Sequence, residues 1–308
     1  MPGACPPTSG FLCYNRPVHR FSRAPIVKPA LEALLARTDA AARVRGDPVE
    51  LPHRYKRQED VEVAALLSAA LAYGRVDLFK PRLIGLLESL GAAPGAVARD
   101  STARQLLART AGFSYRMTDG KDVACLLFGA GAILRRHGSL GSSFEGHYRR
   151  LGEASVRGAL GAFVDELCGQ DFTAITGLPG PTRRLKHLLP HPGRGSACKR
   201  LNLFLRWMIR GPDGVDFGLW DVPASALVVP LDTHVHRIGR LVGLTRRKDL
   251  SWRTAEDVTA RLRVLDAADP VRYDFSLSHL GISGECPSRR DDGKCQPCPL
   301  KPICRHWG

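Results

Sequence analysis

Apolar residues recur at intervals of three and four along most of the chain, which is the repeat of an α-helix with one buried face. Leu31, Leu34 and Leu35 follow this repeat, and Gly46 stands where the segment can end. Asp119 is placed to cap a later segment that Gly138 can close. The segments that we predict to be helical are 27–45, 58–73, 78–90, 124–136, 143–168, 196–210, 232–242 and 252–265.

Signals for β-strands are few, and the best of them, at 226–229, is short. Residues 1–25 are rich in proline, glycine and serine, which indicates a flexible tail. The pattern therefore predicts an all-α fold whose last segment, where glycine, proline and cysteine replace the helical repeat, forms an irregular loop.

Four of the nine cysteines fall within the last 23 residues, in the pattern C-x8-C-x2-C-x5-C. They are Cys286, Cys295, Cys298 and Cys304. Thiolates gathered in this way point to a metal or a cluster, since disulfides are rare where the cell keeps thiols reduced. A zinc ribbon would repeat the C-x2-C pair twice, whereas the irregular spacing suits a [4Fe–4S] cluster. Zinc is the alternative metal, and four free thiols that bind no metal are the remaining alternative.

The chain carries 45 lysine and arginine residues against 30 acidic ones, a net charge of +15. Such a charge favours a polyanionic partner, although a GC-rich coding sequence would also enrich arginine. No apolar run approaches the roughly 18 residues that a membrane span needs. The N-terminal segment lacks the apolar core of a secretory signal, so we expect a cytoplasmic protein.

The segment GRGSACKRLNLFLR begins with Gly193 and Gly195, and we expect Ser196 to cap the helix that follows. This places Lys199 in the first turn, where the positive end of the helix dipole disfavours an ammonium and favours the neutral amine of a nucleophile. The glycine-rich turn also presents N–H groups that suit a phosphate. Alternatively, Lys199 and Arg200 are solvated charges at the start of an amphipathic helix.

A second candidate is the segment PLDTHVHRIGRLVG, in which Asp232 can cap a helix. A carboxylate at a helix N-terminus stays ionised, and it can stabilise a cationic transition state or orient a water molecule. By itself, however, Asp232 is only a cap. His234 and His236 are two positions apart and face different sides of a helix, so we interpret them as packing or phosphate-contacting residues rather than metal ligands.

Taken in this order, the lysine turn, the LDTHVHRIGRLVGL segment and the four cysteines resemble the helix-hairpin-helix DNA glycosylase superfamily, and most of all its endonuclease III type members. The segment VEVAALLSAALAYGR, at 61–75, is similar to an early helix of that superfamily. More narrowly, GSACKRLNLFLRW and the segment around Asp232 resemble an uncharacterised bacterial family known only as a domain of unknown function. The resemblance implies two helical lobes, 57–221 with the hairpin-like turn, and 26–56 together with 222–308, which carries the cluster loop.

The resemblance implies that Lys199 attacks a nucleotide flipped out of double-stranded DNA and that Asp232 stabilises the charge on its sugar. The four cysteines would hold a structural [4Fe–4S] cluster. The resemblance thus implies a monomeric base-excision DNA glycosylase. It does not identify the damaged base that is removed, or whether an AP lyase step follows. The alternative is a non-catalytic binder of damaged or structured nucleic acid. The residues expected to contact DNA are Gly193, Gly195, Ser196, Arg200, His234, Arg237, Arg289, Arg290 and Lys294.

Overall fold

The computed structural model describes residues 21–307, and helices dominate this part of the chain, which confirms the all-α prediction. The tail predicted at 1–25 lies outside the described residues as far as residue 20, and the first helix begins at Ala24. Within residues 21–307 the regular strands are two short ones that pair as an antiparallel hairpin, β1 (Ser114–Tyr115) and β2 (Thr118–Asp119).

The strand predicted at 226–229 is wrong. This segment leaves a 3-10 turn at Ala224–Ala226 and continues without a partner strand. Its backbone bonds go to the surrounding helices instead: Val156 N–H donates to the Ala226 carbonyl at 3.0 Å, and Val229 N–H donates to the Thr259 hydroxyl at 3.0 Å.

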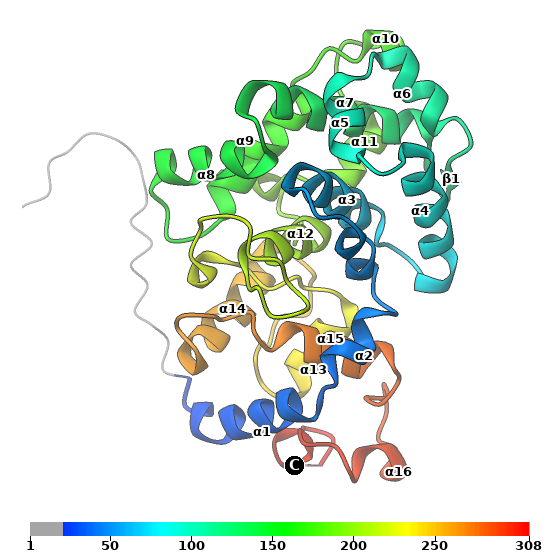
Figure 1. Cartoon of the computed structure of the whole chain (residues 1–308). Coiled ribbons are helices and arrows are strands. Elements are labelled where there is room, and N and C mark those ends of the chain that lie inside the picture. The colour runs from blue at the N-terminus through cyan, green and yellow to red at the C-terminus, as the bar shows by residue number, and fades with distance from the viewer. Residues whose placement is uncertain (1–20, 308) are drawn as a thin grey trace, which may run out of the picture.

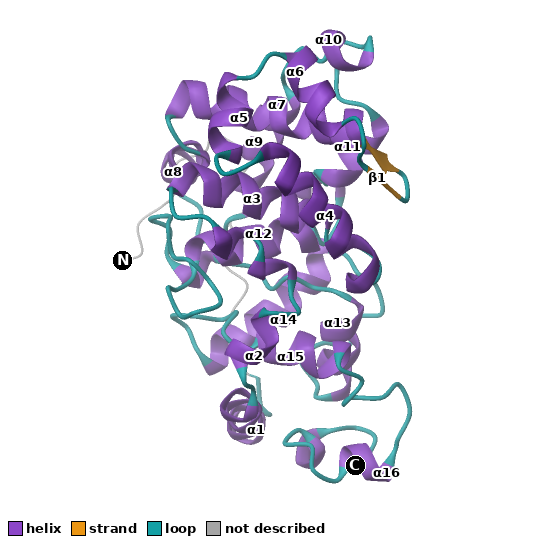
Figure 2. Ribbon diagram, turned by 45° about the vertical axis from the view of Figure 1, so that its right-hand side comes forward, coloured by secondary structure: helices purple, strands orange, loops and turns teal. Residues whose placement is uncertain are grey.

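The middle of the chain forms one group of helices, which occupies the upper part of Figure 1 and of Figure 2. Helix α7 packs against α5, α6 and α9, and α3 packs against α5 and α12. All of α3 from Glu59 onward is buried. The helices are α3 (Gln58–Leu71), α4 (Val76–Leu90), α5 (Pro94–Asp100), α6 (Ala103–Thr110), α7 (Gly120–His137), α8 (Leu140–Leu151), α9 (Arg157–Cys168), α10 (Thr173–Thr176), α11 (Arg183–Leu188) and α12 (Lys199–Ile209).

The two ends of the described chain form the second group, in the lower part of Figure 1. Helix α1 lies near the C-terminal loop, and Arg23 joins the two by donating to the carbonyls of Val242 at 3.2 Å and Ile303 at 2.9 Å. The helices of this group are α1 (Ala24–Arg37), α2 (Ala40–Val44), α13 (Thr233–Leu241), α14 (Trp252–Leu265), α15 (Asp274–Ile282) and α16 (Asp292–Cys295).

Two long predicted helices are each broken in two. The segment 27–45 breaks because Thr38 is extended and Asp39 caps α2 by accepting from Ala42 N–H at 2.9 Å. The segment 143–168 breaks at Gly152, whose left-handed backbone ends α8. In both places a local capping signal outweighs the continuing apolar repeat.

The predicted cap at Asp119 is confirmed, and it forms a capping box with Asp122 at the start of α7. Gly138 ends this helix as expected. None of the helices within residues 21–307 combines the length and the apolar character that crossing a membrane requires.

Candidate functional site

A cleft of ≈ 850 Å³ runs between the two groups of helices. The connection from α3 to α4 and the start of α12 form one wall, and the start of α13 and the length of α15 form the other. The titratable side chains that line it are Asp47, Tyr73, Arg75, Asp77, Lys186, His187, Cys198, Lys199, Arg200, Asp232, His234, Asp274 and His279.

Lys199 is the first residue of α12, it is half-buried, and it lines this cleft. The prediction that Ser196 caps the helix is wrong. Ser196 instead pairs with Ser251 in an isolated bridge, and its hydroxyl accepts from Cys198 N–H at 3.2 Å. Cys198, in a left-handed conformation with φ 47°, precedes the helix in its place. The lysine therefore stands at the helix start itself, closer to the positive end of the dipole than we predicted.

Asp232 is the N-cap of α13, which confirms the predicted cap. Its Oδ1 accepts from Val235 N–H at 2.7 Å, and the residue is half-buried at the edge of the cleft. The structure thus brings Lys199 and Asp232 to one cavity from two separate helices. The two residues are not neighbours in the sequence. Lys199 belongs to the first group of helices and Asp232 to the second, and the connection from α12 to α13 crosses from one group to the other.

Another charged residue of the cleft, Asp274, was not predicted from the sequence. It begins α15, is 2% exposed, and its Oδ2 accepts from Arg206 Nη1 at 2.8 Å. Burial raises the pKa of Asp274 to about 6, and the charge of Asp232 acts in the same direction, while Arg206 and Lys199 act against it. The one signal in the sequence is a lone carboxylate at the head of the segment DFSLSHLGI, which has no other acidic residue.

Arg206 anchors the helix that carries Lys199. It is 2% exposed and lies between two carboxylates, with Asp216 Oδ2 accepting from both its Nε and its Nη2 at 3.1 Å and Asp274 on the other side. Arg210 also donates to Asp216, at 2.8 Å. Removing one partner of such a buried network leaves a charge uncompensated, so the network fixes α12 against α15.

Tyr73 and Arg200 form the wall of the cleft on the α3 side. The Arg200 guanidinium carbon lies 5.1 Å from the centre of the Tyr73 ring, and its Nη1 donates to the Ala70 carbonyl at 2.5 Å. Its other terminal nitrogen donates to the His187 carbonyl. Burial lowers the pKa of Arg200 to about 10. The guanidinium is thus engaged with the protein itself and stiffens the wall.

The remaining residues expected to contact DNA are spread over the surface. Gly193, Gly195 and Ser196 are exposed in the turn before α12, and His234 lines the cleft beside Gly281. Arg237 points instead to the cysteine loop, where it donates to the carbonyls of Cys286 and Pro287. Among the loop residues, Arg290 stacks on Trp307 at 3.7 Å, Lys294 donates to the Gly284 carbonyl at 3.2 Å, and Arg289 is exposed.

The four C-terminal cysteines line one small cavity, closed by apolar residues of α13 and by Leu300 and Trp307. Burial raises the pKa of Cys298 and Cys304, and the neighbouring cysteines add to both shifts. Among the described residues, no group of three or more His, Cys, Asp or Glu side chains is gathered tightly enough to hold one metal ion. The four thiols thus border one common space.

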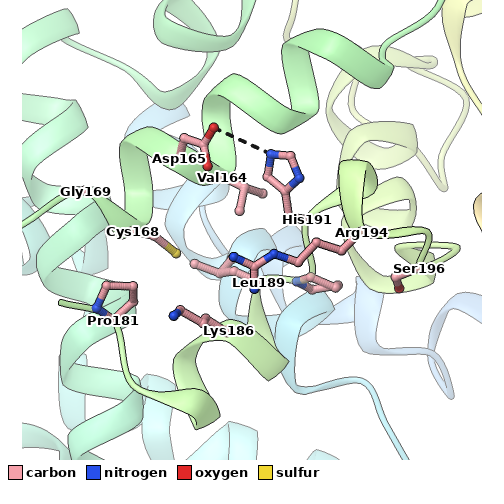
Figure 3. Close-up of a pocket in the computed structure, with 11 residues that line it drawn as sticks. Val164, Asp165, Cys168, Gly169, Pro181, Lys186, Leu189, His191, Arg194 and Ser196 are labelled. Atoms are coloured by element: carbon pink, nitrogen blue, oxygen red, sulfur yellow. Dashed lines mark ion pairs between the residues drawn. The ribbon is translucent and has the colours of Figure 1, made fainter.

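A second cavity, of ≈ 500 Å³, lies between α9 and the connection from α11 to α12 (Figure 3). His191 accepts from Gly193 N–H at Nδ1, 3.0 Å away, which leaves the ring proton on Nε2, toward Asp165 at 3.6 Å. Lys186 and Arg194 also line this space. It adjoins the main cleft, and the residues that border both are Lys186, Pro190 and Ser196.

A family model described as "Protein of unknown function (DUF2400)" matches residues 47–283, which is more than half of the 308-residue chain. None of the curated proteins compared with the chain matches it. The match corrects the expected membership of the helix-hairpin-helix DNA glycosylase superfamily: no family of that superfamily is detected, and the family that is detected has no activity in its description. The short motifs that carried the resemblance are too brief to establish such a membership by themselves.

Proposed function

The chain belongs to the DUF2400 family of proteins of unknown function, and from the geometry of its cleft we propose that it is a base-excision DNA glycosylase. The observation that carries the proposal is that Lys199 and Asp232, from two separate helices, line the same cleft. Its volume of ≈ 850 Å³ falls within the range of small-molecule sites and is large enough for one everted nucleotide.

An amine and a carboxylate in one cavity are suited to cleave a glycosidic bond. The Nζ atom of Lys199 attacks the sugar C1′, and the bond from C1′ to the base nitrogen breaks, with its electron pair leaving on the base. Asp232 stabilises the positive charge that develops on the sugar. If the sugar ring then opens, the adduct becomes a Schiff base, and elimination of the 3′ phosphate would nick the strand as an AP lyase does.

The net charge of +15 supports double-stranded DNA as the partner, because phosphate contacts dominate affinity in such complexes. We infer that the helices of residues 57–221 act as one lobe of a monomer. Residues 26–56 and 222–308 act as the other, so that the duplex lies across the cleft between them. We infer a cytoplasmic protein, because cysteines stay reduced in that compartment.

We further propose that Cys286, Cys295, Cys298 and Cys304 hold a [4Fe–4S] cluster. The four thiols line one common cavity. Together with their irregular spacing along the chain, this fits a cluster, whose thiolates bind four separate irons. When bound, the cluster crosslinks the loop.

Metal analysis tests the cluster. Anaerobically purified protein should contain about four irons and four sulfides and show the visible absorbance of an iron–sulfur centre. Cys298→Ser should lose iron, whereas Cys168→Ser, which alters a cysteine of α9, should keep it. A preparation with one zinc and no iron would establish zinc as the resident metal.

A panel of duplexes, each with one damaged base or abasic site, tests the activity. With borohydride present, the wild-type protein should form a covalent adduct on at least one duplex. Lys199→Arg, which keeps the charge but not the nucleophile, should form none. Lys121→Arg, at an exposed position on α7, is the matched control and should react as the wild type does. Salt-sensitive binding without base release or adduct on any duplex would favour a non-catalytic binder.

A further inference from the structure

We propose that the second cavity, between α9 and the connection from α11 to α12, binds a backbone phosphate of the DNA strand whose nucleotide enters the main cleft. Two cationic side chains, Lys186 and Arg194, hold the phosphate there. This inference rests on the proposed function for its partner, a DNA strand. Binding of the strand can be measured without base removal, so the two proposals can fail separately.

The backbone of the turn before α12 does not offer the phosphate contacts that its glycines suggest. Gly193 N–H donates to His191 Nδ1 at 3.0 Å, and Arg194 N–H donates to the His191 carbonyl at 3.0 Å. Gly195 N–H donates to the Pro192 carbonyl at 3.2 Å. These three donors are occupied within the turn, so side chains have to supply the donors for a phosphate in their place.

Lys186 and Arg194 are able to supply them. Lys186 lies on α11 and Arg194 in the turn, and both side chains extend into the cavity (Figure 3). Both residues are exposed, and neither side chain forms an ion pair or a hydrogen bond within residues 21–307. Nearby arginines are already engaged, since Arg184 pairs with Asp119 and Arg200 donates to two backbone carbonyls. Two cations that face one hollow without a protein partner suit a phosphate.

The other titratable groups of the cavity do not cancel these two charges. His191 accepts at Nδ1 and is therefore a neutral ring. Burial raises the pKa of the Cys168 thiol to about 11, so the thiol is uncharged at neutral pH, and both cations oppose this shift. Among the described residues that line the cavity, Asp165 alone is acidic, and its exposed side chain faces His191 at 3.6 Å. Two positive charges thus face one negative charge that solvent screens.

The second cavity adjoins the main cleft, and Lys186, Pro190 and Ser196 border both spaces. Its volume of ≈ 500 Å³ and its apolar lining, which includes Val164 and Leu189, leave room for a phosphate together with its sugar. A strand whose nucleotide enters the main cleft continues past Lys186. A neighbouring phosphate of the same strand therefore reaches the two cations.

Duplexes in which a neutral methylphosphonate replaces one phosphodiester test the assignment. Each duplex carries a non-cleavable abasic-site analogue and one neutral linkage at a different position, and fluorescence anisotropy gives the Kd. For the wild type, the neutral linkage at one position close to the analogue should weaken binding about 10-fold. Lys186→Ala/Arg194→Ala should bind the unmodified duplex about 10-fold more weakly and lose its sensitivity to that linkage alone.

The chain offers a matched control, Lys121→Ala/Arg183→Ala. It also removes one lysine and one arginine, both exposed, and neither residue lines the second cavity or the cleft. This variant should keep the sensitivity of the wild type to the same linkage, because it alters the general attraction and not the contact. The proposal is overturned if Lys186→Ala/Arg194→Ala stays sensitive to every linkage, or if the control loses the same one.

A change in folding is separated from a loss of charge by the exchange Lys186→Arg/Arg194→Lys, which keeps both cations. It should retain the sensitivity to the linkage, whereas circular dichroism should show the same helix content in all the variants. If the exchange loses this sensitivity as fully as the double alanine variant does, the charges are not what binds the phosphate, and the proposal is overturned.

A free nucleotide is the other source of a phosphate, and thymidine 5′-monophosphate is the probe for it. Calorimetric titration should show no binding to the wild type at concentrations where the duplex binds, because the strand supplies most of the contacts. Binding of this nucleotide to the wild type but not to Lys186→Ala/Arg194→Ala, with the same linkage profile for both proteins, would assign the cavity to a free nucleotide. That result would overturn the strand proposal.

The activity and the phosphate contact give separate results. If the linkage profile changes as expected but no duplex releases a base or forms an adduct, the second cavity binds the strand and the proposed function fails. If an adduct forms on Lys199 but no neutral linkage distinguishes the wild type from Lys186→Ala/Arg194→Ala, the proposed function stands and the phosphate contact is overturned.

Discussion

Arg237, on helix α13, donates a hydrogen bond to the Sγ atom of Cys286 at 3.3 Å. It also donates to the carbonyls of Cys286 at 2.7 Å and of Pro287 at 2.8 Å. Because Asp232 caps the same helix, one rigid element joins the cysteine loop to the carboxylate of the cleft. The cysteine loop therefore helps to hold α13, and with it Asp232, in position at the cleft.

Arg237→Ala should loosen the cysteine loop, because it leaves two carbonyls and a thiol without their donor. We expect a loss of about 1–3 kcal/mol in the free energy of unfolding and faster release of bound metal to a chelator. Arg240→Ala, at an exposed position of the same helix, is the control and should change neither. Equal metal release from both variants would show that Arg237 does not support the loop.

Glu166 should make stability depend on pH in the acid range. Burial alone would raise the pKa of Glu166, but hydrogen bonds from Ser143, His147 and His137 outweigh it and lower the pKa to about 2. A lowered folded-state pKa adds stability above the unfolded-state value, and this stability is lost as the pH falls from about 4.5 to about 2.

Glu166→Gln should therefore flatten the stability profile across that range, by about 1–2 kcal/mol once solvent screening is included. Urea unfolding at several pH values measures the effect. Glu88→Gln, which alters an exposed carboxylate of α4, should keep the wild-type slope. If the slope survives in Glu166→Gln, other carboxylates are responsible for it.

Gly131 lies where α7 passes close to the backbone of α5. A Cβ atom at this position would lie 1.9 Å from the Ala98 carbonyl oxygen, so Gly131→Ala must push the helices apart and should cost about 1–3 kcal/mol. Gly146, on α8, has nothing within 4 Å of such a Cβ, and Gly146→Ala should stabilise by about 0.5–1 kcal/mol. Thermal unfolding compares the two, and a neutral Gly131→Ala would contradict this packing.

DNA binding should weaken steeply with salt if the positive charge serves a nucleic acid. With about five phosphates contacted, the logarithm of the binding constant should fall against the logarithm of salt concentration with a slope of about −4.5. Fluorescence anisotropy with a labelled duplex measures this slope. A flat response would indicate that the arginine content reflects coding composition.

Local signals were predictable from the sequence, and contacts between distant segments were not. Asp119 and Asp232 were predicted as caps because a cap depends on residues three or four positions away. Ser196 was misjudged because its partner, Ser251, lies far along the chain and draws it out of the helix start. Asp274 was missed for the same reason, since its significance depends on Arg206 from another helix.

The cleft itself shows the same division. The sequence predicted Lys199 and Asp232 as reactive residues, and the structure brings both to one cavity. Arg200 and Arg237 were expected on the DNA-facing surface because both are basic, yet their guanidinium groups bind backbone carbonyls within the protein. Charge alone does not reveal whether an arginine faces solvent or a carbonyl, so these roles required the fold.

Peptide mapping of a borohydride-trapped complex tests the central claim most directly. The protein is trapped with borohydride on a duplex that contains an abasic site or a damaged base that the protein removes. The complex is digested, and mass spectrometry identifies the peptide that carries the reduced sugar. We predict that the adduct lies on Lys199. An adduct on another lysine or on the N-terminal amine, with Lys199 unmodified, would contradict the proposed nucleophile and with it the assignment of the cleft.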